Sequence, residues 1–262
     1  MGSASGNLTC TITKRDNSFH DDTHYMLCEI KDQIVDAPNI TIASTGEDDL
    51  VNDFSIWNQT NLFFLPDGIG ERFPNLFTVG SGYTKIRSLQ RSNFVGFTRL
   101  RSVFVTDSDL EKIQHGTFDQ LGSLVIMDLS RNKLKRISPS WFENKRLLAW
   151  LNFNSNEIEF IPRGCFDNLP KLDTVLLSYN KIWSIAAPLF LHNHVIDTLH
   201  LLFNPLVFIS DTAFDGSFNR LEVSLHSTTC FRNRYPILTI PPDDWKSIVR
   251  EACNGTNVLN LE

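Results

Sequence analysis

Two short histidine clusters are the segments of this chain best suited to chemistry. They are His20-Asp21-Asp22-Thr23-His24 and His192-Asn193-His194, in which imidazole or carboxylate groups could bind zinc. No G-x-S-x-G elbow, glycine-rich phosphate loop or H-E-x-x-H motif occurs in the sequence. A polar surface loop explains either cluster, so we expect no metal site, no cofactor and no enzymatic activity.

The charge balance disfavours nucleic acid as a partner. The 262 residues carry a net charge of −6, whereas a phosphate backbone needs a basic surface. The basic residues that do cluster, around Lys133, Arg136, Lys145 and Arg146, are interpreted as a solvated face. No apolar run reaches the roughly 18 residues of a membrane span, so we expect no membrane insertion by this chain. Residues 1–6 are interpreted as an appended junction because they lack the apolar core of a signal peptide.

Four glycosylation sequons indicate an extracellular environment. They lie at Asn7, Asn39, Asn58 and Asn254, each with threonine in the third position. Because one such tripeptide is common by chance, the argument depends on their number and on the two that lie beside cysteines. The sequence therefore predicts a secreted protein or the ectodomain of a membrane protein.

Several residue types return every 24 residues along most of the chain. The asparagine column is Asn132, Asn156, Asn180 and Asn204. A phenylalanine column runs Phe94, Phe118, Phe142, Phe166, Phe190 and Phe214. A leucine column runs Leu76, Leu100, Leu124, Leu148 and Leu172, and an isoleucine column runs Ile113, Ile137, Ile161, Ile185 and Ile209. Columns that share one register indicate a stack of structural repeats.

The repeated unit, L-x-x-L-x-L-x-x-N-x-L-x-x-I-x-x-x-x-F, resembles the extracellular 24-residue leucine-rich repeat over roughly residues 50–228. The resemblance implies an α/β repeat fold, a curved solenoid with a parallel sheet on its concave face and an irregular or short-helical convex face. The predicted organisation is an N-terminal cap (1–45), leucine-rich repeats (46–228) and a C-terminal cap (229–262).

The asparagine column has a structural explanation. After each strand the chain turns inward and leaves backbone groups that no ladder pairs, and an asparagine side chain offers both a donor and an acceptor. Upstream, we place Thr60, Thr84 and Ser108 in the same column, with the register around residues 52–60 uncertain by one position. A hydroxyl has one donor hydrogen and a shorter reach, so these turns should be held less tightly.

The five cysteines fit a capped solenoid. We predict the bridges Cys10–Cys28 and Cys230–Cys253, each stabilising its cap by about 3 kcal/mol. Residues 243–252 are expected to form a short capping helix. Two interpretations of Cys165 stay open, a packing cysteine or an inter-chain bridge in a homo- or heterodimer.

Residues that point outward from the predicted sheet are the candidates for binding a protein partner. Adjacent strands lie about 4.8 Å apart, so same-position side chains of neighbouring repeats should nearly touch. The sequence predicts one apolar patch of Phe104, Ile126 and Trp150, and a second patch of Leu176, Tyr179, Leu202 and Phe203. Exposed apolar patches mark contact sites, and tryptophan and tyrosine are common binding hot spots.

These features predict a non-enzymatic recognition module that binds another protein through its concave face. The two-cysteine caps and divergent first repeats resemble secreted insect leucine-rich-repeat proteins of innate immunity. In that family a coiled coil follows the solenoid; this sequence contains no heptads, and a chain truncated at Glu262 would lack them. Two alternatives stay open: the ligand-binding ectodomain of a receptor or adhesion protein, and a self-associating matrix protein.

Overall fold

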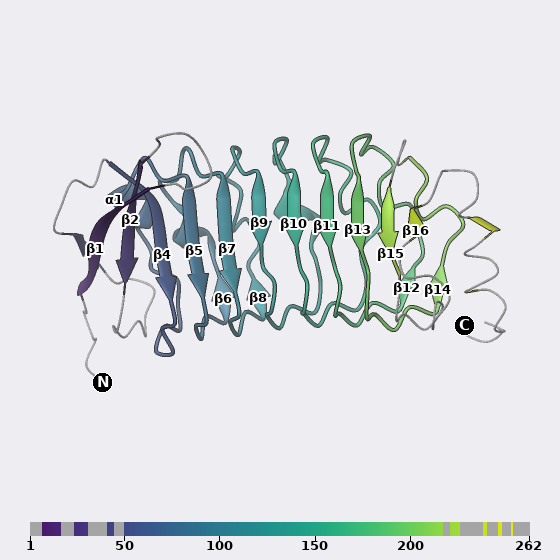
Figure 1. Cartoon of the computed structure of the whole chain (residues 1–262), viewed down its shortest axis with the longest axis horizontal. Coiled ribbons are helices and arrows are strands. Elements are labelled where there is room, and N and C mark those ends of the chain that lie inside the picture. Colours follow the sequence, from purple (N-terminus) through teal and green to yellow (C-terminus); the bar gives the residue numbers. More distant parts are fainter. Residues whose placement is uncertain are drawn as a thin grey trace. The chain divides into compact units, whose positions relative to one another are not determined.

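The computed structural model describes residues 7–16, 24–30, 41–44, 50–216, 221–225, 238–239, 246–247 and 253. The chain divides into two compact units, Met1–Lys133 and Leu134–Glu262. In both units the main sheet consists largely of parallel strands contributed one per repeat, which makes the fold a leucine-rich-repeat solenoid (Figure 1).

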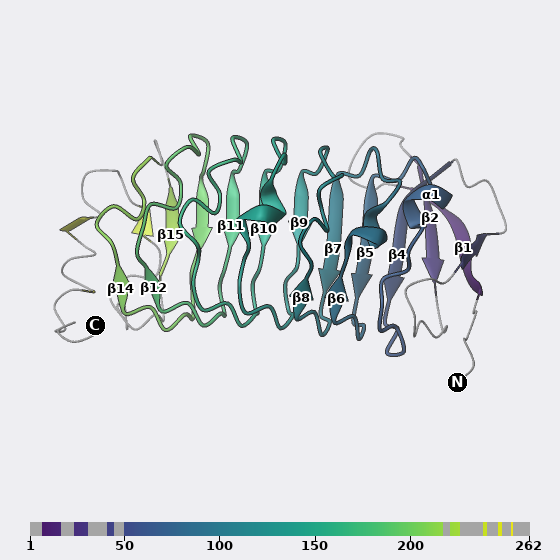
Figure 2. The same ribbon diagram turned by 180° about the vertical axis from the view of Figure 1, so that it is seen from behind.

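The first unit begins with antiparallel pairing and continues with parallel strands. Its sheet has the order β3-β1-β2-β4-β5-β7-β9. The strands are β1 (Asn7–Asp16), β2 (His24–Ile30), β3 (Thr41–Ser44), β4 (Val51–Trp57), β5 (Thr78–Gly82), β7 (Ser102–Thr106) and β9 (Ile126–Asp128). Behind the sheet lie the helix α1 (Ile69–Arg72), the 3-10 turn η2 (Arg91–Phe94) and the short parallel pair β6 (Ser88–Leu89) and β8 (Lys112–Ile113). Figure 2 shows that this back side is made mainly of loops.

The second unit repeats the arrangement with shorter strands. Its sheet has the order β10-β11-β13-β15-β16. The strands are β10 (Trp150–Asn152), β11 (Thr174–Leu176), β13 (Thr198–His200), β15 (Glu222–Ser224) and β16 (Leu238–Thr239), the last antiparallel to β15. The 3-10 turn η3 (Pro139–Phe142) and the parallel pair β12 (Ser184–Ile185) and β14 (Phe208–Ile209) complete the unit.

The repeating apolar columns form the core of each unit. Phe94 and Phe118 pack with their rings tilted by 56° and their centroids 5.4 Å apart in the first unit. Phe166 lies 5.8 Å from Phe142 and from Phe190 in the second. All of these rings are buried, so a period of 24 residues places one ring per coil in a continuous column.

The asparagine column binds neighbouring coils as the sequence predicts. Asn180 Oδ1 accepts the Ile158 N–H at 3.0 Å, and its Nδ2 donates to the carbonyl oxygens of Phe153 (2.9 Å) and Leu177 (3.1 Å). In the first unit the hydroxyls of Thr84 and Ser108 instead bond each other at 2.7 Å. Each asparagine therefore bonds backbone groups of two coils through both ends of its amide, whereas Ser108 Oγ makes the backbone bonds of the hydroxyl pair, accepting the Thr84 N–H and donating to the Thr106 carbonyl.

The register of the first repeat corrects the assignment of Thr60 to this column. Asp53 pairs with Thr78, an offset of 25 residues, whereas Thr78 pairs with Ser102 at an offset of 24. The column residue is therefore Gln59, which is 7% exposed and donates from Nε2 to the Trp57 carbonyl at 3.0 Å. Thr60 is exposed. A longer amide side chain thus occupies the column in a coil that has an extra residue.

Lys145 contradicts the interpretation of the basic clusters as a solvated face. Its side chain is 1% exposed, and Nζ donates to the Glu143 carbonyl at 2.8 Å. Lys145 stands in the column occupied by the buried Leu121 and Leu169, so its methylene stem takes the place of an apolar side chain. The expected capping helix lies outside the described residues apart from residues 246–247, which are helical.

Candidate functional site

The outward face of each sheet, called here the sheet face, carries the residues predicted to bind a partner. In the first unit Phe104 and Ile126 are half-buried on the adjacent strands β7 and β9. The register sets Ile126 opposite Ser102 and Phe104 opposite Asp128, so the two apolar side chains are diagonal neighbours. Trp150, the third member of the predicted patch, belongs to the second unit.

Trp57 extends the apolar surface of the first unit and was not predicted as a site residue. A methyl group built at Gly82 would overlap the Trp57 ring, and one at Gly80 would lie 3.5 Å from Cζ2. The indole therefore lies across β5 where two glycines leave room for it. Gly80 pairs with Phe104, so Trp57 and Phe104 flank the same position. The sequence signal was the pair of glycines at outward positions.

In the second unit, Trp150, Leu176 and Leu202 are half-buried on the sheet face, while Tyr179 and Phe203 are exposed. Tyr179 is 55% exposed and Phe203 44% exposed. Their rings stack 4.4 Å apart with an interplanar angle of 14°. The structure thus brings together Tyr179 and Phe203, which we call the aromatic ladder.

Both ladder residues occupy a backbone conformation that bulky side chains rarely adopt. One residue near the end of each strand has φ between 47° and 59°, and we call this site the left-handed position. Its occupants are Asn58, Tyr83, Asp107, Arg131, Ser155, Tyr179 and Phe203. In the first unit, Arg131 Nη1 lies 3.1 Å from Asp107 Oδ1 across adjacent coils. The left-handed position therefore presents a different side chain in each repeat on a constant backbone.

A second exposed apolar cluster lies beyond the strands of the second unit. Trp183 is 47% exposed, Phe160 is 48% exposed and Val207 is 38% exposed. The Val207 N–H donates to the Trp183 carbonyl at 2.9 Å, and Phe160 forms a β-bridge with Ser184, so the three lie on neighbouring coils. The sequence carried a signal for Trp183, because its equivalents in earlier repeats are Arg87, Glu111, Lys135 and Glu159.

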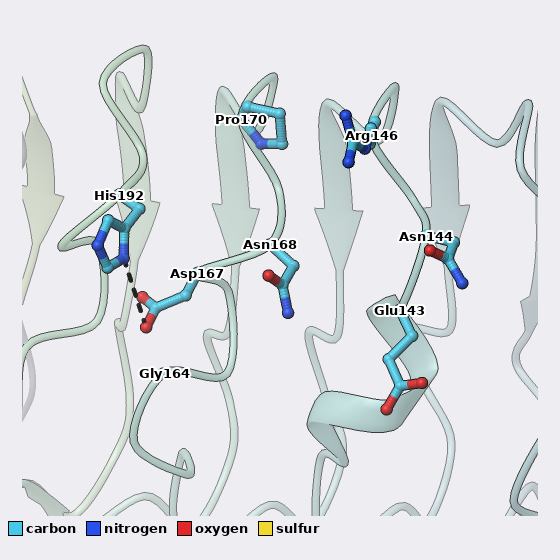
Figure 3. A pocket seen from close by; sticks show the side chains of 8 residues that line it. All are labelled: Glu143, Asn144, Arg146, Gly164, Asp167, Asn168, Pro170 and His192. Atoms are coloured by element: carbon cyan, nitrogen blue, oxygen red, sulfur yellow. Dashed lines mark ion pairs between the residues drawn. The ribbon is translucent and has the colours of Figure 1, made fainter.

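A polar hollow of about 810 Å³ opens among the loops of the second unit (Figure 3). Its lining residues are Glu143, Asn144, Arg146, Gly164, Asp167, Asn168, Pro170 and His192. His192 Nδ1 lies 3.7 Å from Asp167 Oδ2, which is longer than a hydrogen bond. No serine, threonine, cysteine or lysine side chain lines the hollow.

The histidine clusters of the sequence do not form a metal site within the described residues. In His192-Asn193-His194, the central Asn193 is fully buried and donates to the carbonyls of Phe166 (2.9 Å) and Leu169 (2.7 Å). Among the residues that the structure describes, no group of three or more histidine, cysteine, aspartate or glutamate side chains could hold a metal ion. Residues 20–23 of the other cluster lie outside those residues, and His24 begins β2.

The cysteines divide into bonded and free ones. Cys10 and Cys253 are buried and disulfide-bonded. The side chains of their predicted partners, Cys28 and Cys230, lie outside the described residues, so both pairings stay predictions. Cys165 is free and 2% exposed, and desolvation by burial raises the pKa of its thiol far above the ordinary value. A buried neutral thiol suits the packing interpretation and disfavours an inter-chain bridge.

Only one sequon lies where its side chain is described. Asn58 is exposed at the left-handed position of the first repeat, and its N–H donates to the Gly82 carbonyl at 3.0 Å. Asn39 and Asn254, and the side chain of Asn7, lie outside the described residues. In the part of the chain that the structure describes, no helix is long and apolar enough to cross a membrane.

Comparisons with known proteins agree with this fold. The leucine rich repeat family model matches residues 98–154 and 124–182. The chain is 29% identical over 124 residues to the leucine-rich repeat-containing G-protein coupled receptor 5 of Rattus norvegicus, a match covering 47% of this chain and 13% of the receptor. It is 32% identical over 94 residues to nephrocan of Mus musculus, covering 36% of this chain and 18% of nephrocan. The chain thus matches less than a fifth of the length of either relative.

Two solved structures share the fold at low sequence identity. The TLR13–ssRNA13 complex matches with a TM-score of 0.65 at 20% identity, covering 70% of this chain and 26% of that one. The Toll–Spatzle complex of Drosophila matches with a TM-score of 0.62 at 20% identity, covering 69% and 24%. Repeats, fold and comparisons together support a leucine-rich-repeat solenoid.

Proposed function

We propose that this chain is a non-enzymatic, extracellular recognition module that binds another protein through its sheet face, the concave face of the sequence prediction. The observation that carries the proposal is the aromatic ladder. Tyr179 and Phe203 are about half exposed, and they stand at left-handed positions that a small or polar side chain would fill at lower cost.

The cost of this arrangement favours a binding role over a structural one. A left-handed conformation costs a residue with a Cβ about 1–2 kcal/mol, and asparagine or aspartate relieves part of it. The stacking of the two rings stabilises the fold by at most about 0.5–1.5 kcal/mol. Ser155 holds the same conformation one repeat earlier without a ring, so the fold itself does not require an aromatic residue there. A partner that covers the rings would add the missing stabilisation.

The relatives support a recognition role without defining the partner. One relative is a receptor, and the Toll structure is a complex with Spatzle. For this chain, we propose a secreted protein of insect innate immunity on the sequence resemblance and the four sequons. The similarity to a G-protein coupled receptor favours a second candidate, the ligand-binding ectodomain of a membrane receptor.

The test compares partner capture by wild-type protein and by the double variant Tyr179→Asn/Phe203→Asn. Affinity purification from the native extracellular fluid should recover a protein with the wild type and not with the variant, and calorimetry on the purified partner should give at least a tenfold weaker affinity. Tyr83→Asn is the matched control, because Tyr83 is 52% exposed at a left-handed position of the first unit. A partner that binds wild type and double variant equally would contradict the proposal.

A further inference from the structure

The sheet face of the second unit has a carboxylate rim at the edge where its strands begin. The rim consists of Asp173, Asp197 and Glu222. The Thr174 hydroxyl donates to Asp173 Oδ1 at 2.7 Å, and the Thr198 hydroxyl donates to Asp197 Oδ2 at 3.4 Å. Thr174 and Thr198 are paired neighbours on β11 and β13, so these two carboxylates lie beside adjacent strands of the sheet face. Glu222 is opposite Thr198 and is exposed.

The aromatic ladder borders the opposite edge of the same strands. Tyr179 lies five positions after Thr174, which corresponds to roughly 15 Å of nearly extended chain. Phe203 covers one face of the Tyr179 ring. Tyr179 is nevertheless 55% exposed, and the left-handed position of the preceding coil holds Ser155, which has no ring. An aromatic face of this kind attracts a planar cation.

The strands between the two edges contain no compensating cation. Neither lysine nor arginine occurs in β10, β11, β13 or β15, and His200 is their only basic residue. Of the nearby lysines, Lys181 is paired with Glu157 at 2.7 Å. Lys171 precedes the rim by two residues in the sequence. The sheet face of the second unit is therefore acidic along one edge and aromatic along the other.

We propose that the sheet face of the second unit binds a basic polypeptide segment, with an arginine guanidinium stacked on Tyr179 and further basic side chains paired with Asp173, Asp197 and Glu222. This inference rests on the proposed function and specifies the chemistry of the partner. Guanidinium groups both stack on aromatic rings and form bidentate bonds with carboxylates, so arginine suits both edges.

The available area and charge disfavour other occupants. An aromatic side chain buries about 150–250 Å² when fully covered, so the half-exposed ladder offers roughly 200 Å². A stable interface with a second copy of the chain needs about 800 Å² per partner. A narrow segment fits this surface better. Carboxylates along the rim repel the phosphates of a nucleic acid.

The experiment measures binding of the whole chain to short synthetic peptides by fluorescence anisotropy. The probes are an arginine-rich peptide and its length-matched lysine-rich and glutamate-rich counterparts, with a single-stranded RNA as a fourth ligand. We expect the arginine peptide to bind most tightly, to weaken as salt is raised, and to lose about tenfold in affinity in the triple variant Asp173→Asn/Asp197→Asn/Glu222→Gln. Each replacement keeps an oxygen that can accept the same hydrogen bond and removes only the charge. The double variant Tyr179→Asn/Phe203→Asn should weaken the arginine peptide more than the lysine peptide.

A matched triple neutralisation away from the sheet face controls for net charge. Glu111→Gln/Asp119→Asn/Glu159→Gln removes three carboxylates of exposed residues elsewhere and should leave peptide binding unchanged. Equal losses in both triple variants, equal affinity for arginine and lysine peptides, or tighter binding of RNA would each overturn the inference.

The two proposals fail in distinguishable ways. If the captured natural partner depends on the aromatic ladder but not on the carboxylate rim or on salt, the recognition role stands and the basic-segment inference is wrong. If neither the ladder variant nor the rim variant changes capture, both are wrong.

Discussion

Two adjacent left-handed positions hold an ion pair in the first unit, and two others hold a ring stack in the second. Arg131 and Asp107 face each other across adjacent coils at 3.1 Å, and Tyr179 and Phe203 do so at 4.4 Å between centroids. The backbone is nearly the same, with φ of 55° and 47° in the first pair and 58° and 55° in the second. The ion pair leaves each charge matched, whereas the stack leaves apolar surface in water. The difference shows that the same backbone position can carry side chains that satisfy each other or side chains that leave apolar surface exposed for a partner.

The largest expected effect comes from replacing an asparagine of the column that bonds neighbouring coils. Asn180→Ala would leave the buried Ile158 N–H without its acceptor, which costs about 1–3 kcal/mol, and would remove one of the two amide donors that the Phe153 and Leu177 carbonyls each have. We expect a loss of about 3 kcal/mol in the free energy of unfolding, measured by urea denaturation. Thr84→Ala is the comparison in the first unit and should cost about 1 kcal/mol, because it removes a single hydroxyl pair. Equal losses would show that the two kinds of column residue hold their turns equally well.

A smaller effect, the salt dependence of the stability change, distinguishes the loss of the ion pair from the loss of the ring stack. Arg131→Asn removes an exposed pair worth at most about 1 kcal/mol and places a residue that tolerates the left-handed conformation, so stability should change little. Any loss should diminish as salt is raised. Tyr179→Asn should also change stability by less than about 1 kcal/mol, because the lost stacking is offset by relieved backbone strain. This change should not depend on salt, because no charge is removed. Urea denaturation at low and high salt measures both, and a salt-dependent loss in Tyr179→Asn would contradict this assignment of forces.

The smallest expected effect is a pH dependence confined to the first unit. Hydrogen bonding from Lys133, which lies 2.8 Å from the Asp109 carboxylate, outweighs desolvation and lowers the pKa of that carboxyl, with Lys85 contributing at 3.3 Å. A carboxylate with a lowered folded-state pKa contributes stability above its unfolded pKa of about 3.9 and loses that contribution as pH falls through the folded value. The stability difference between wild type and Asp109→Asn should therefore be at most about 1 kcal/mol near neutral pH and should shrink below about pH 4. Unfolding curves between neutral and acidic pH measure it, and a difference that persists in acid would argue against the ion pairs.

Periodicity was sufficient to predict the fold and the role of the asparagines. A side chain that recurs at one interval must meet the same environment in every coil, so columns of leucine, phenylalanine and asparagine predict inward positions and coil contacts. The same reasoning predicted that Tyr179 and Phe203 would lie together, since equal positions of adjacent repeats are neighbours.

Departures from the period were harder to predict. Gln59 compensates for one extra residue in its coil, and no spacing rule distinguished it from Thr60 before the strand register was known. The charge of Lys145 predicts a surface position, although its column of buried leucines indicates that it replaces a leucine. Trp57 lies over β5 because two glycines of another repeat leave space, which is a contact between different positions. Sequence columns compare like positions only, so they cannot reveal such packing.

The antiparallel strands have a consequence for assembly. A parallel stack of coils ends in a row of unpaired backbone groups that another coil of the same direction could extend without limit. In the first unit β1 runs antiparallel to β2 and the edge strand β3 is parallel to β1, and in the second the edge strand β16 runs antiparallel to β15. Each reversal places next to the stack a strand whose direction and hydrogen-bond spacing no longer match those of an added coil. The reversed strands therefore disfavour the addition of a further parallel coil at the outer strand of each unit's sheet.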